Sequence, residues 1–376
     1  MDETRRFLGI DLGTTYSCVA RVDEYGRVVV LQNFEGKFTT PSVVYFGSDH
    51  EVTVGESAKE YSKLEPENTV PFIKRQMGKD EAFAAPTKFP GGRTPTEISS
   101  YILKKIVKDA NDAGQYPEPI KKVVIACPAY FGQKERLRTK QAGEMAGLEV
   151  LAIIDEPKAA AIACGQARKE DEKIVLVYDL GGGTFDVNLI QVSGDAIIVV
   201  ATDGNAGLGG YDWDKKLAKY LLSEYNKQKG TSYEMREGTA FFNEMMIFAE
   251  GQKKRLTAEK DKDSPVSAVL AIKGDTAKID ITCAVFDAMT SELLNETIER
   301  TRAVLKVGKE KGFVRLDEVL LVGGSSRMLQ IKERVDAALG CDAKLNDPDW
   351  CVAKGAAIWA LHKSFTIAEE VRQFWL

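Results

Sequence analysis

The chain contains one strand–loop–strand–turn–strand unit twice, and this repeat constrains the fold more than any other feature. Residues 7–12 form an apolar run that includes Asp11, and residues 174–179 form a second run that ends on Asp179. Leu-Gly follows each carboxylate. Two more predicted strands then follow each glycine-rich segment, at 16–22 and 27–32 in the first unit and at 185–192 and 196–202 in the second. Asp11 and Asp179 lie 168 positions apart, which is about one domain length, so we expect two similar lobes that face one another.

Strong helix signals accompany each unit. Thr94-Pro95-Thr96-Glu97 predicts a capping box with proline at the first helical position. Ile98, Ile102 and Ile106 then recur every four residues, and Gly114 is a residue type that ends helices. Further helices are predicted over 133–146, 156–168, 211–227, 239–257, 286–311 and 327–339. Continuous apolar runs at 121–127, 150–154 and 318–322 predict strands that helices cover on both faces. The fold class is therefore α/β.

The repeat also suggests how the chain is divided. We expect a first lobe over residues 1–170 and a second lobe over 171–348. The stretch around 36–114 is rich in Gly, Pro and Thr and is predicted to be an outer subdomain inserted in the first lobe. Residues 211–285 are predicted to be the corresponding insertion in the second lobe. A C-terminal helix over 349–376 is expected to return to the first lobe.

Composition excludes several functional classes. The 376 residues carry a net charge of −5 with acidic and basic residues interspersed, so no basic face for nucleic acid is indicated. No apolar run approaches the ~18 residues of a membrane span, and the first residues lack the apolar stretch of a signal peptide. The six cysteines include no Cys-x-x-Cys pair, and only two histidines are present, so no zinc site is indicated. Scattered cysteines in apolar runs favour a cytoplasmic location.

The two glycine-rich loops have the chemistry of a phosphate site. Backbone N–H groups of Gly13 and of 181–183 can approach phosphate oxygens, because glycine allows close backbone contact. The hydroxyls of Thr14, Thr15 and Thr184 add hydrogen-bond donors. Asp11 and Asp179 at the strand ends, with Asp186 nearby, are candidate ligands of Mg²⁺, directly or through water.

The alternative is that each loop is only a hairpin turn, and two loops in the same context argue against it. No Gly-x-x-x-x-Gly-Lys-Ser/Thr motif is present, and no Gly-x-Gly-x-x-Gly follows a strand. A nucleotide would therefore lie between two hairpins. A third glycine element, residues 322–327, joins a strand to a helix. It is either a backbone surface for a base or sugar, with Arg327 placed to stack on the ring, or a plain turn.

These segments together resemble a known family. The resemblance is carried by Phe7-Leu-Gly-Ile-Asp-Leu-Gly-Thr-Thr-Tyr16, Asp179-Leu-Gly-Gly-Gly-Thr-Phe-Asp186 and Gly323-Gly-Ser-Ser-Arg327. Residues 68–75, 128–131, 156–161 and 346–349 also fit, in the same order along nearly the whole chain. The set resembles the nucleotide-binding domain of the DnaK-type seventy-kilodalton heat-shock chaperones.

The resemblance implies an actin-like ATPase (ribonuclease H-like) fold, with two lobes, each a mixed five-stranded sheet flanked by helices, and an ATP·Mg²⁺ cleft between them. It implies catalytic roles for Lys74, Glu156, Asp179 and Thr184. It implies phosphate contacts from Gly13, Thr14, Thr15, Tyr16, Gly181, Gly182, Gly183 and Thr184, and adenosine contacts from Glu250, Lys253, Lys254, Gly323, Gly324, Ser325, Arg327 and Asp349. Asp11, Asp179 and Asp186 would hold Mg²⁺, with K⁺ as a further candidate ion. Pro128 and Arg136 would relay the nucleotide state.

The chain departs from the family pattern in places. Tyr211 and Trp213 stand where the family usually has Glu and Phe, and Met328-Leu329 replaces Ile-Pro. The basic residues near 253–255 are shifted, so the cation that stacks on adenine is Lys254 or Arg255. Residues 364–376 do not read as the family's acidic-leucine linker, so we expect the peptide-binding domain to be absent from this chain.

The resulting hypothesis is the slow ATPase domain of a chaperone, a monomer that works with a peptide-binding domain and with J-domain or nucleotide-exchange co-chaperones. No nucleic acid or membrane partner is expected. The alternatives are a stand-alone actin-like ATPase or a small-molecule kinase of the same superfamily, and a non-enzymatic, filament-forming or regulatory ATP binder. A kinase would need an acceptor pocket with its own catalytic carboxylate.

Overall fold

The computed structural model describes residues 7–47, 51–80, 93–114, 116, 118–165, 172–194, 196–259 and 261–361. The first lobe is built on a mixed sheet whose strands are ordered β3-β2-β1-β8-β9. These strands are β1 (Phe7–Asp11), β2 (Tyr16–Val22), β3 (Val28–Leu31), β8 (Lys122–Cys127) and β9 (Glu149–Asp155), and β4 (Thr40–Pro41) pairs with β2. β1 is antiparallel to β2 and parallel to β8.

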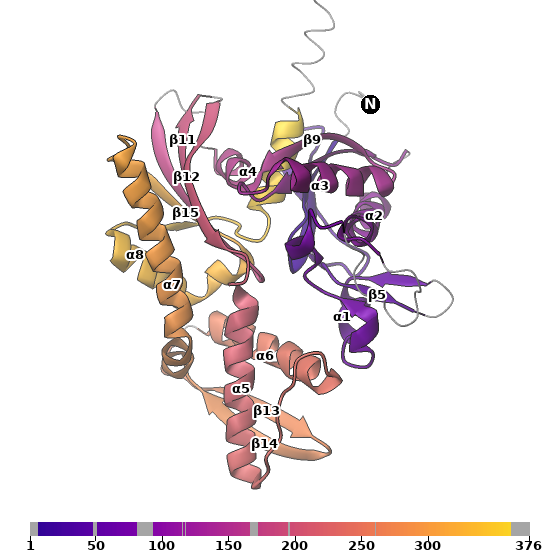
Figure 1. Cartoon of the computed structure of the whole chain (residues 1–376), viewed down its shortest axis with the longest axis vertical. Coiled ribbons are helices and arrows are strands. Elements are labelled where there is room, and N and C mark those ends of the chain that lie inside the picture. The colour runs from indigo at the N-terminus through magenta and orange to yellow at the C-terminus, as the bar shows by residue number, and fades with distance from the viewer. Residues whose placement is uncertain are drawn as a thin grey trace, which may run out of the picture.

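The second lobe repeats this arrangement. Its sheet has the order β12-β11-β10-β15-β16. The strands are β10 (Lys173–Leu180), β11 (Phe185–Ser193), β12 (Ala196–Asn205), β15 (Glu318–Val322) and β16 (Lys344–Leu345). As in the first sheet, the leading strand β10 is antiparallel to the next strand and parallel to β15. The predicted duplication and the α/β class are therefore confirmed (Figure 1).

Helices cover the outer faces of both sheets. In the first lobe these are α2 (Pro95–Gly114) and α3 (Gln133–Met145). The capping box is present, because the Thr94 amide donates to Glu97 Oε2 at 2.7 Å and the Glu97 amide donates to Thr94 Oγ1 at 3.2 Å. Ile98, Ile102 and Ile106 are buried against the strands. In the second lobe, α7 (Cys283–Glu310) and α8 (Leu329–Leu339) pack beside β11, β12 and β15 (Figure 1).

Two helices form the layer between the sheets. They are α4 (Glu156–Ala163) and a helix over 351–361. Both present alanines to a core that also contains residues of β8, β10 and β15. A Cβ added to Gly9 would overlap the backbone of Ala357, so this helix lies directly on β1. Figure 1 shows α4 and the yellow C-terminal helix between the two sheets.

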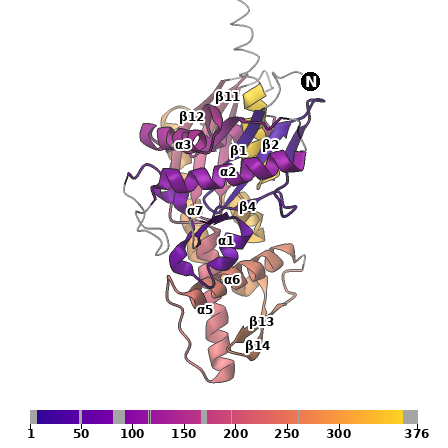
Figure 2. The same ribbon diagram turned by 90° about the vertical axis from the view of Figure 1, so that its right-hand side faces the viewer.

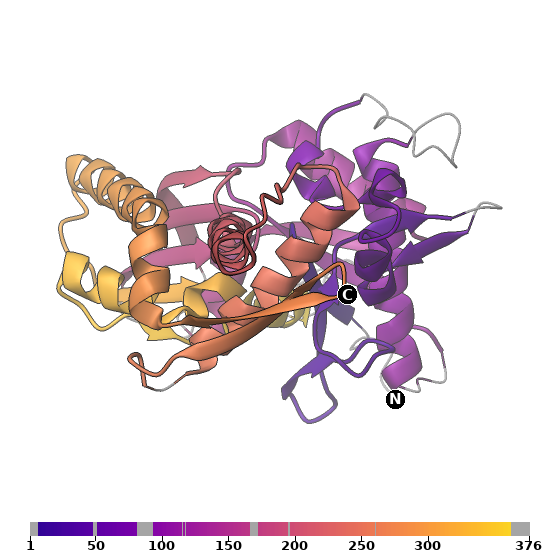
Figure 3. The ribbon, with the colours of Figure 1, turned by 90° about the horizontal axis from the view of Figure 1, so that it is seen from below.

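Smaller units extend from each sheet on the same side of the molecule. On the second lobe they are α5 (Gly210–Lys229), α6 (Ala240–Ala258) and the hairpin β13 (Val266–Ile272) and β14 (Asp275–Ile281). On the first lobe they are β5 (Val44–Phe46), β6 (Val52–Val54), β7 (Thr69–Val70) and α1 (Glu56–Tyr61). The Asn243 side chain of α6 donates to the Ser62 carbonyl after α1 at 2.8 Å, so the two units touch (Figures 2 and 3). Among the described residues, no helix is long and apolar enough to cross a membrane.

Some predicted boundaries need correction. The helix predicted over 327–339 begins at Leu329, because Gly324–Arg327 is a separate 3₁₀ turn, η6. Gly323 has φ 80° and Met328 is extended, which interrupts the helix on both sides of the turn. The helix predicted from residue 286 begins at Cys283, where Thr282 caps it. Residues 166–168 and 362–376 of the predicted helices lie outside the described residues. The limits of the lobes and insertions stay predictions.

Candidate functional site between the two lobes

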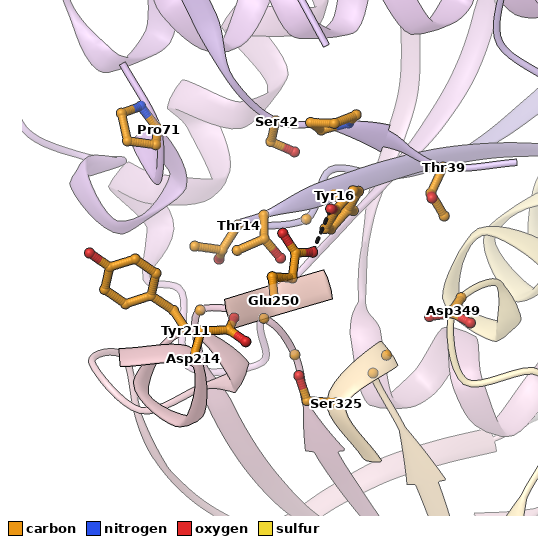
Figure 4. A pocket seen from close by; sticks show the side chains of 18 of the residues that line it. Thr14, Tyr16, Thr39, Ser42, Pro71, Tyr211, Asp214, Glu250, Ser325 and Asp349 are labelled. Carbon is orange, nitrogen blue, oxygen red and sulfur yellow. Dashed lines mark hydrogen bonds between the residues drawn. The ribbon is translucent and has the colours of Figure 1, made fainter. Parts of the chain in front are cut away.

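A cavity of about 1200 Å³ lies between the lobes. Both repeated units contribute to its wall, with Asp11 and Asp179 from the leading strands and a glycine-rich loop from each lobe. Of the predicted phosphate contacts, Gly13, Thr14, Thr15, Tyr16, Gly181, Gly182, Gly183 and Thr184 all line it. Figure 4 shows this cavity with Thr14 and Tyr16 on one wall and Glu250 and Ser325 on the other.

The two loops touch each other across the cavity. A Cβ added to Gly183 would lie 2.6 Å from Thr14 Cγ2, and one added to Gly182 would overlap Thr15 Oγ1. Glycine is therefore required in the second loop by the first loop. The second loop is itself a tight hairpin, closed by the Gly181 amide donating to the Thr184 carbonyl at 3.0 Å. Backbone N–H groups and threonine hydroxyls are thus gathered in one place, which suits an anionic ligand.

Lys74 and Glu156 form a buried ion pair at the floor of the cavity. Lys74 lies on the 3₁₀ turn η4 (Ile73–Gln76), and Glu156 is the first residue of α4. Lys74 Nζ is 2.6 Å from Glu156 Oε1. Burial alone would lower the pKa of Lys74, but the Glu156 and Asp11 carboxylates raise it above its usual range. Lys74 is therefore a permanent cation in a place where water is scarce.

Three further carboxylates surround this pair. Burial, and next the negative charge of Glu156, raise the pKa of Asp11 and of Asp186 to about 7. The pKa of Asp179 is raised well above its ordinary value for the same reasons. Asp11 and Asp179 line the cavity, whereas Asp186 is outside its lining and is the register partner of Asp179 across β10 and β11. Lys74 is the cation that lowers the pKa of all three.

These carboxylates fit a hydrated divalent cation better than a protein-only metal cage. No cluster of three or more His, Cys, Asp or Glu side chains in the described residues is arranged to hold a metal ion alone. Mg²⁺ is commonly held by one or two carboxylates, with waters and substrate phosphates completing its octahedron. The excess of buried negative charge is what such an ion would offset.

Glu250 of α6 connects the two lobes. Tyr16 donates its hydroxyl to Glu250 Oε1 at 2.7 Å, and Lys254 donates to the same oxygen at 2.7 Å. Lys59 of α1 pairs with Glu250 Oε2. Although burial opposes ionisation, Lys59 and Lys254 hold the pKa of Glu250 well below its usual range. Glu250 and Lys254 were predicted to contact adenosine and Tyr16 to contact phosphate; Lys59 was missed, because nothing local distinguishes it from a surface lysine.

Lys253 has partners within the second lobe. It donates to the Gly210 carbonyl at 2.9 Å and pairs with Asp214 of α5 at 2.8 Å. Burial raises the pKa of Asp214 to about 6, although Lys253 opposes the rise. Sequence reasoning missed Asp214. Both residues line the cavity, so the pair also shapes its wall.

The third glycine element meets the start of the C-terminal helix. Arg327 pairs with Asp349 at 2.6 Å, and a Cβ on Gly324 would lie 2.6 Å from Asp349 Oδ1. The Gly323 amide donates to the Pro348 carbonyl at 2.9 Å. Ser325 lies on the same wall (Figure 4). The predicted adenosine contacts from two distant segments are thus brought together.

Pro128 and Arg136 do not line the cavity. Arg136 of α3 donates to the Phe131 carbonyl at 2.8 Å, and the Phe131 amide donates to the Pro128 carbonyl at 3.1 Å. Arg136 also pairs with Asp155 at 2.5 Å. Because Asp155 immediately precedes Glu156, Arg136 is connected to the cavity floor through one peptide unit.

Two similar mixed sheets with a glycine-rich hairpin from each at a shared cavity define a protein of the actin-like ATPase class. The family model described as Hsp70 protein matches residues 7–89 and 86–375. The chain is 40% identical over 358 residues to the chaperone protein DnaK of Thermosipho africanus, covering 94% of this chain and 58% of that protein. It is 40% identical over 369 residues to the DnaK of Thermotoga maritima, covering 96% of this chain and 60% of that protein.

The chain belongs to the Hsp70 family. It spans about 60% of the length of the curated relatives it matches. The family assignment and the fold class expected from the sequence are confirmed, and the roles of individual site residues stay predictions.

Proposed function

We propose that this chain is the nucleotide-binding domain of a molecular chaperone, which binds ATP with Mg²⁺ between its lobes and hydrolyses it slowly to ADP and phosphate. The observation that carries the proposal is the meeting of both glycine-rich loops, the Asp11 and Asp179 carboxylates and the Lys74–Glu156 pair at one cavity, with Asp186 paired beside Asp179. Membership of the Hsp70 family supports the same activity.

The phosphate end of the site is assigned first. Amides of the two loops and the hydroxyls of Thr14, Thr15 and Thr184 bind the β- and γ-phosphates. Lys74 and Glu156 orient a water in line with the γ-phosphorus. The bond from this water oxygen to phosphorus forms as the bond to the β–γ bridging oxygen breaks, and the water proton passes to phosphate oxygen. Rigid donors in a site that excludes water stabilise the charge that develops.

Asp11, Asp179 and Asp186 would hold Mg²⁺, directly or through water. When bound, this ion neutralises charge on the phosphates. Because these carboxylates outnumber the single Lys74 cation, K⁺ is proposed as a further ion that would offset their negative charge.

The remaining predicted residues are assigned to adenosine and to coupling. Lys254 and Arg327 are proposed to flank the base. Gly323, Gly324, Ser325 and Asp349 would form the wall beside it, and Glu250 and Lys253 would lie toward the ribose. Bridges from Tyr16 and Lys59 to Glu250 would hold the lobes closed. Pro128 and Arg136 would carry the nucleotide state outward, to a peptide-binding domain and to J-domain or nucleotide-exchange co-chaperones. A monomeric, cytoplasmic protein is part of the proposal.

The test is the Lys74→Ala variant. Phosphate release from ATP should fall about 100-fold or more, as for loss of one preorganised transition-state donor, while ATP binding measured by calorimetry persists. Lys63→Ala is the matched control, because Lys63 forms an exposed pair with Glu60. The parent chain should release inorganic phosphate from ATP when water is the sole phosphoryl acceptor, whereas a small-molecule kinase would need its own acceptor substrate. Equal turnover in the Lys74 variant and the parent chain would refute this role of Lys74.

A further inference from the structure

Phe72, which precedes the turn η4 that contains Lys74, has a backbone conformation that is usual for glycine. Phe72 has φ 57° and ψ 25°, in the left-handed region, and it precedes η4 directly. A bulky side chain is rarely found there, and such strain persists where the surrounding structure imposes it. The phenylalanine ring is therefore expected to have a function at this position.

The Phe72 ring makes its contact across the cavity. Its centroid lies 4.8 Å from that of Tyr211, at an interplanar angle of 72°. This is the edge-to-face arrangement that aromatic pairs prefer. The guanidinium of Arg75, one residue after Lys74, lies 5.0 Å from the Phe72 centroid. Figure 4 shows Pro71, which precedes Phe72, and Tyr211 facing one another at the same end of the cavity.

Tyr211 is fixed to the second glycine-rich loop. Its amide donates to the Gly182 carbonyl at 2.7 Å, in the first turn of α5. Gly209 lies against Gly183, because a Cβ there would be 2.6 Å from the Gly183 backbone. Arg75 also donates to the Gly183 carbonyl. Two connections therefore run from the Lys74 turn to the second loop, one polar through Arg75 and one aromatic through Phe72.

We infer that Phe72 and Tyr211 form an aromatic latch that positions Lys74 when the lobes close. This inference rests on the proposed ATP hydrolysis, because Lys74 is the residue whose position the latch sets. The latch holds η4 against the loop that binds the γ-phosphate, so Lys74 and that loop move together. Phe72 and Tyr211 are positioning residues and make no contact with the reacting atoms.

The ring of Tyr211 carries the contact, and its hydroxyl is dispensable. Within the described part of the chain the hydroxyl has no hydrogen-bond partner, and burial raises the pKa of Tyr211 to about 12. Tyr211→Phe should therefore keep the latch, whereas Tyr211→Ala should remove it. On the other lobe, Phe72→Asn removes the ring but keeps a residue type that tolerates left-handed backbone.

The experiment measures steady-state ATP hydrolysis by the full chain over a range of ATP concentrations that reaches saturation. Tyr211→Ala and Phe72→Asn should each lower the rate about tenfold, with the KM for ATP changed less than twofold. The double variant should be no slower than either single variant, because both changes break one contact. Tyr211→Phe should restore the parent rate. Losses that multiply toward a hundredfold, or a Tyr211→Phe variant as slow as Tyr211→Ala, would overturn the latch.

A second measurement needs no hydrolysis. Hydrogen exchange of a peptide covering residues 70–78 should be about tenfold faster in Tyr211→Ala than in Tyr211→Phe, with exchange in α2 unchanged. Equal exchange in the two variants would refute the latch even if the parent chain hydrolyses ATP. A parent chain that binds but does not hydrolyse ATP would refute the proposed activity, whatever the exchange shows.

Discussion

Replacing Asp11 by asparagine should make the nucleotide-free chain more stable while weakening its binding of Mg²⁺ and ATP. Burial, and next the Glu156 carboxylate, raise the pKa of Asp11 from 3.8 to about 7. The folded chain therefore binds more protons than the unfolded chain between these two values, so the free energy of unfolding decreases as pH rises through this window. The destabilisation caused by the ionised Asp11 carboxylate is fully present above about pH 7 and absent below about pH 4.

The size of this penalty follows from the shift. A rise from 3.8 to about 7 corresponds to about 4 kcal/mol at pH 8. Asparagine has the same shape and no charge, so it removes this cost, and about 4 kcal/mol is the upper limit of the gain. With an unfolding entropy of about 2 cal/mol/K per residue, the Tm of a chain of this size would rise by at most about 5 °C.

The assay is calorimetry of the full chain in EDTA at pH 8 and pH 4. The Asp11→Asn variant should melt higher than the parent chain at pH 8 and equally at pH 4. Asp112→Asn is the control, because Asp112 lies in an exposed pair with Lys108 on α2 and should change the free energy of unfolding by less than about 0.5 kcal/mol. With excess Mg²⁺ and ATP the order should reverse, since the ligand stabilises the parent chain more. A lower Tm for Asp11→Asn at pH 8 without ligand would refute the reasoning.

Two further predictions concern lobe packing and lobe closure. Gly9→Ala should lower the free energy of unfolding in urea by about 2–4 kcal/mol, because the added Cβ would overlap the Ala357 backbone. Gly251→Ala, in open space on α6, should raise it by about 0.5–1 kcal/mol. Similar changes in the free energy of unfolding for the two variants would contradict the packing of the C-terminal helix on β1. The Glu250→Gln variant should release fluorescent ADP about three- to tenfold faster than the parent chain in stopped flow, because the substitution weakens the bridge to Lys59. An unchanged release rate would show that this bridge does not hold the lobes closed.

Local features of the fold were predictable from the sequence because they depend on near neighbours. The strands around Asp11 and Asp179 are apolar runs bounded by glycine, and the capping box at Thr94 needs only Glu97, three residues away. The start of the helix that follows Gly324 was predicted two residues too early. The prediction began this helix at Arg327, but the backbone conformations of Gly323 and Met328 set its start at Leu329.

The candidate site was predictable only in part. The repeat indicated that two glycine-rich loops would face each other, and they do. Lys74 was placed by resemblance, since an isolated lysine carries no local signal and its partner Glu156 lies 82 positions away. Lys59 and Asp214 were missed for the same reason, because their significance comes from Glu250 and Lys253.

The sequence alone therefore determined the duplicated architecture, the fold class and the chemistry of the two loops, since hydrophobic period, caps and glycines act over a few residues. Tertiary structure decided which charges meet. Tyr16 reaches Glu250 across 234 positions, and Phe72 takes a left-handed backbone and meets Tyr211. Such contacts form when two lobes close on one another, and their free energy depends on burial and distance, which are properties of the folded chain alone.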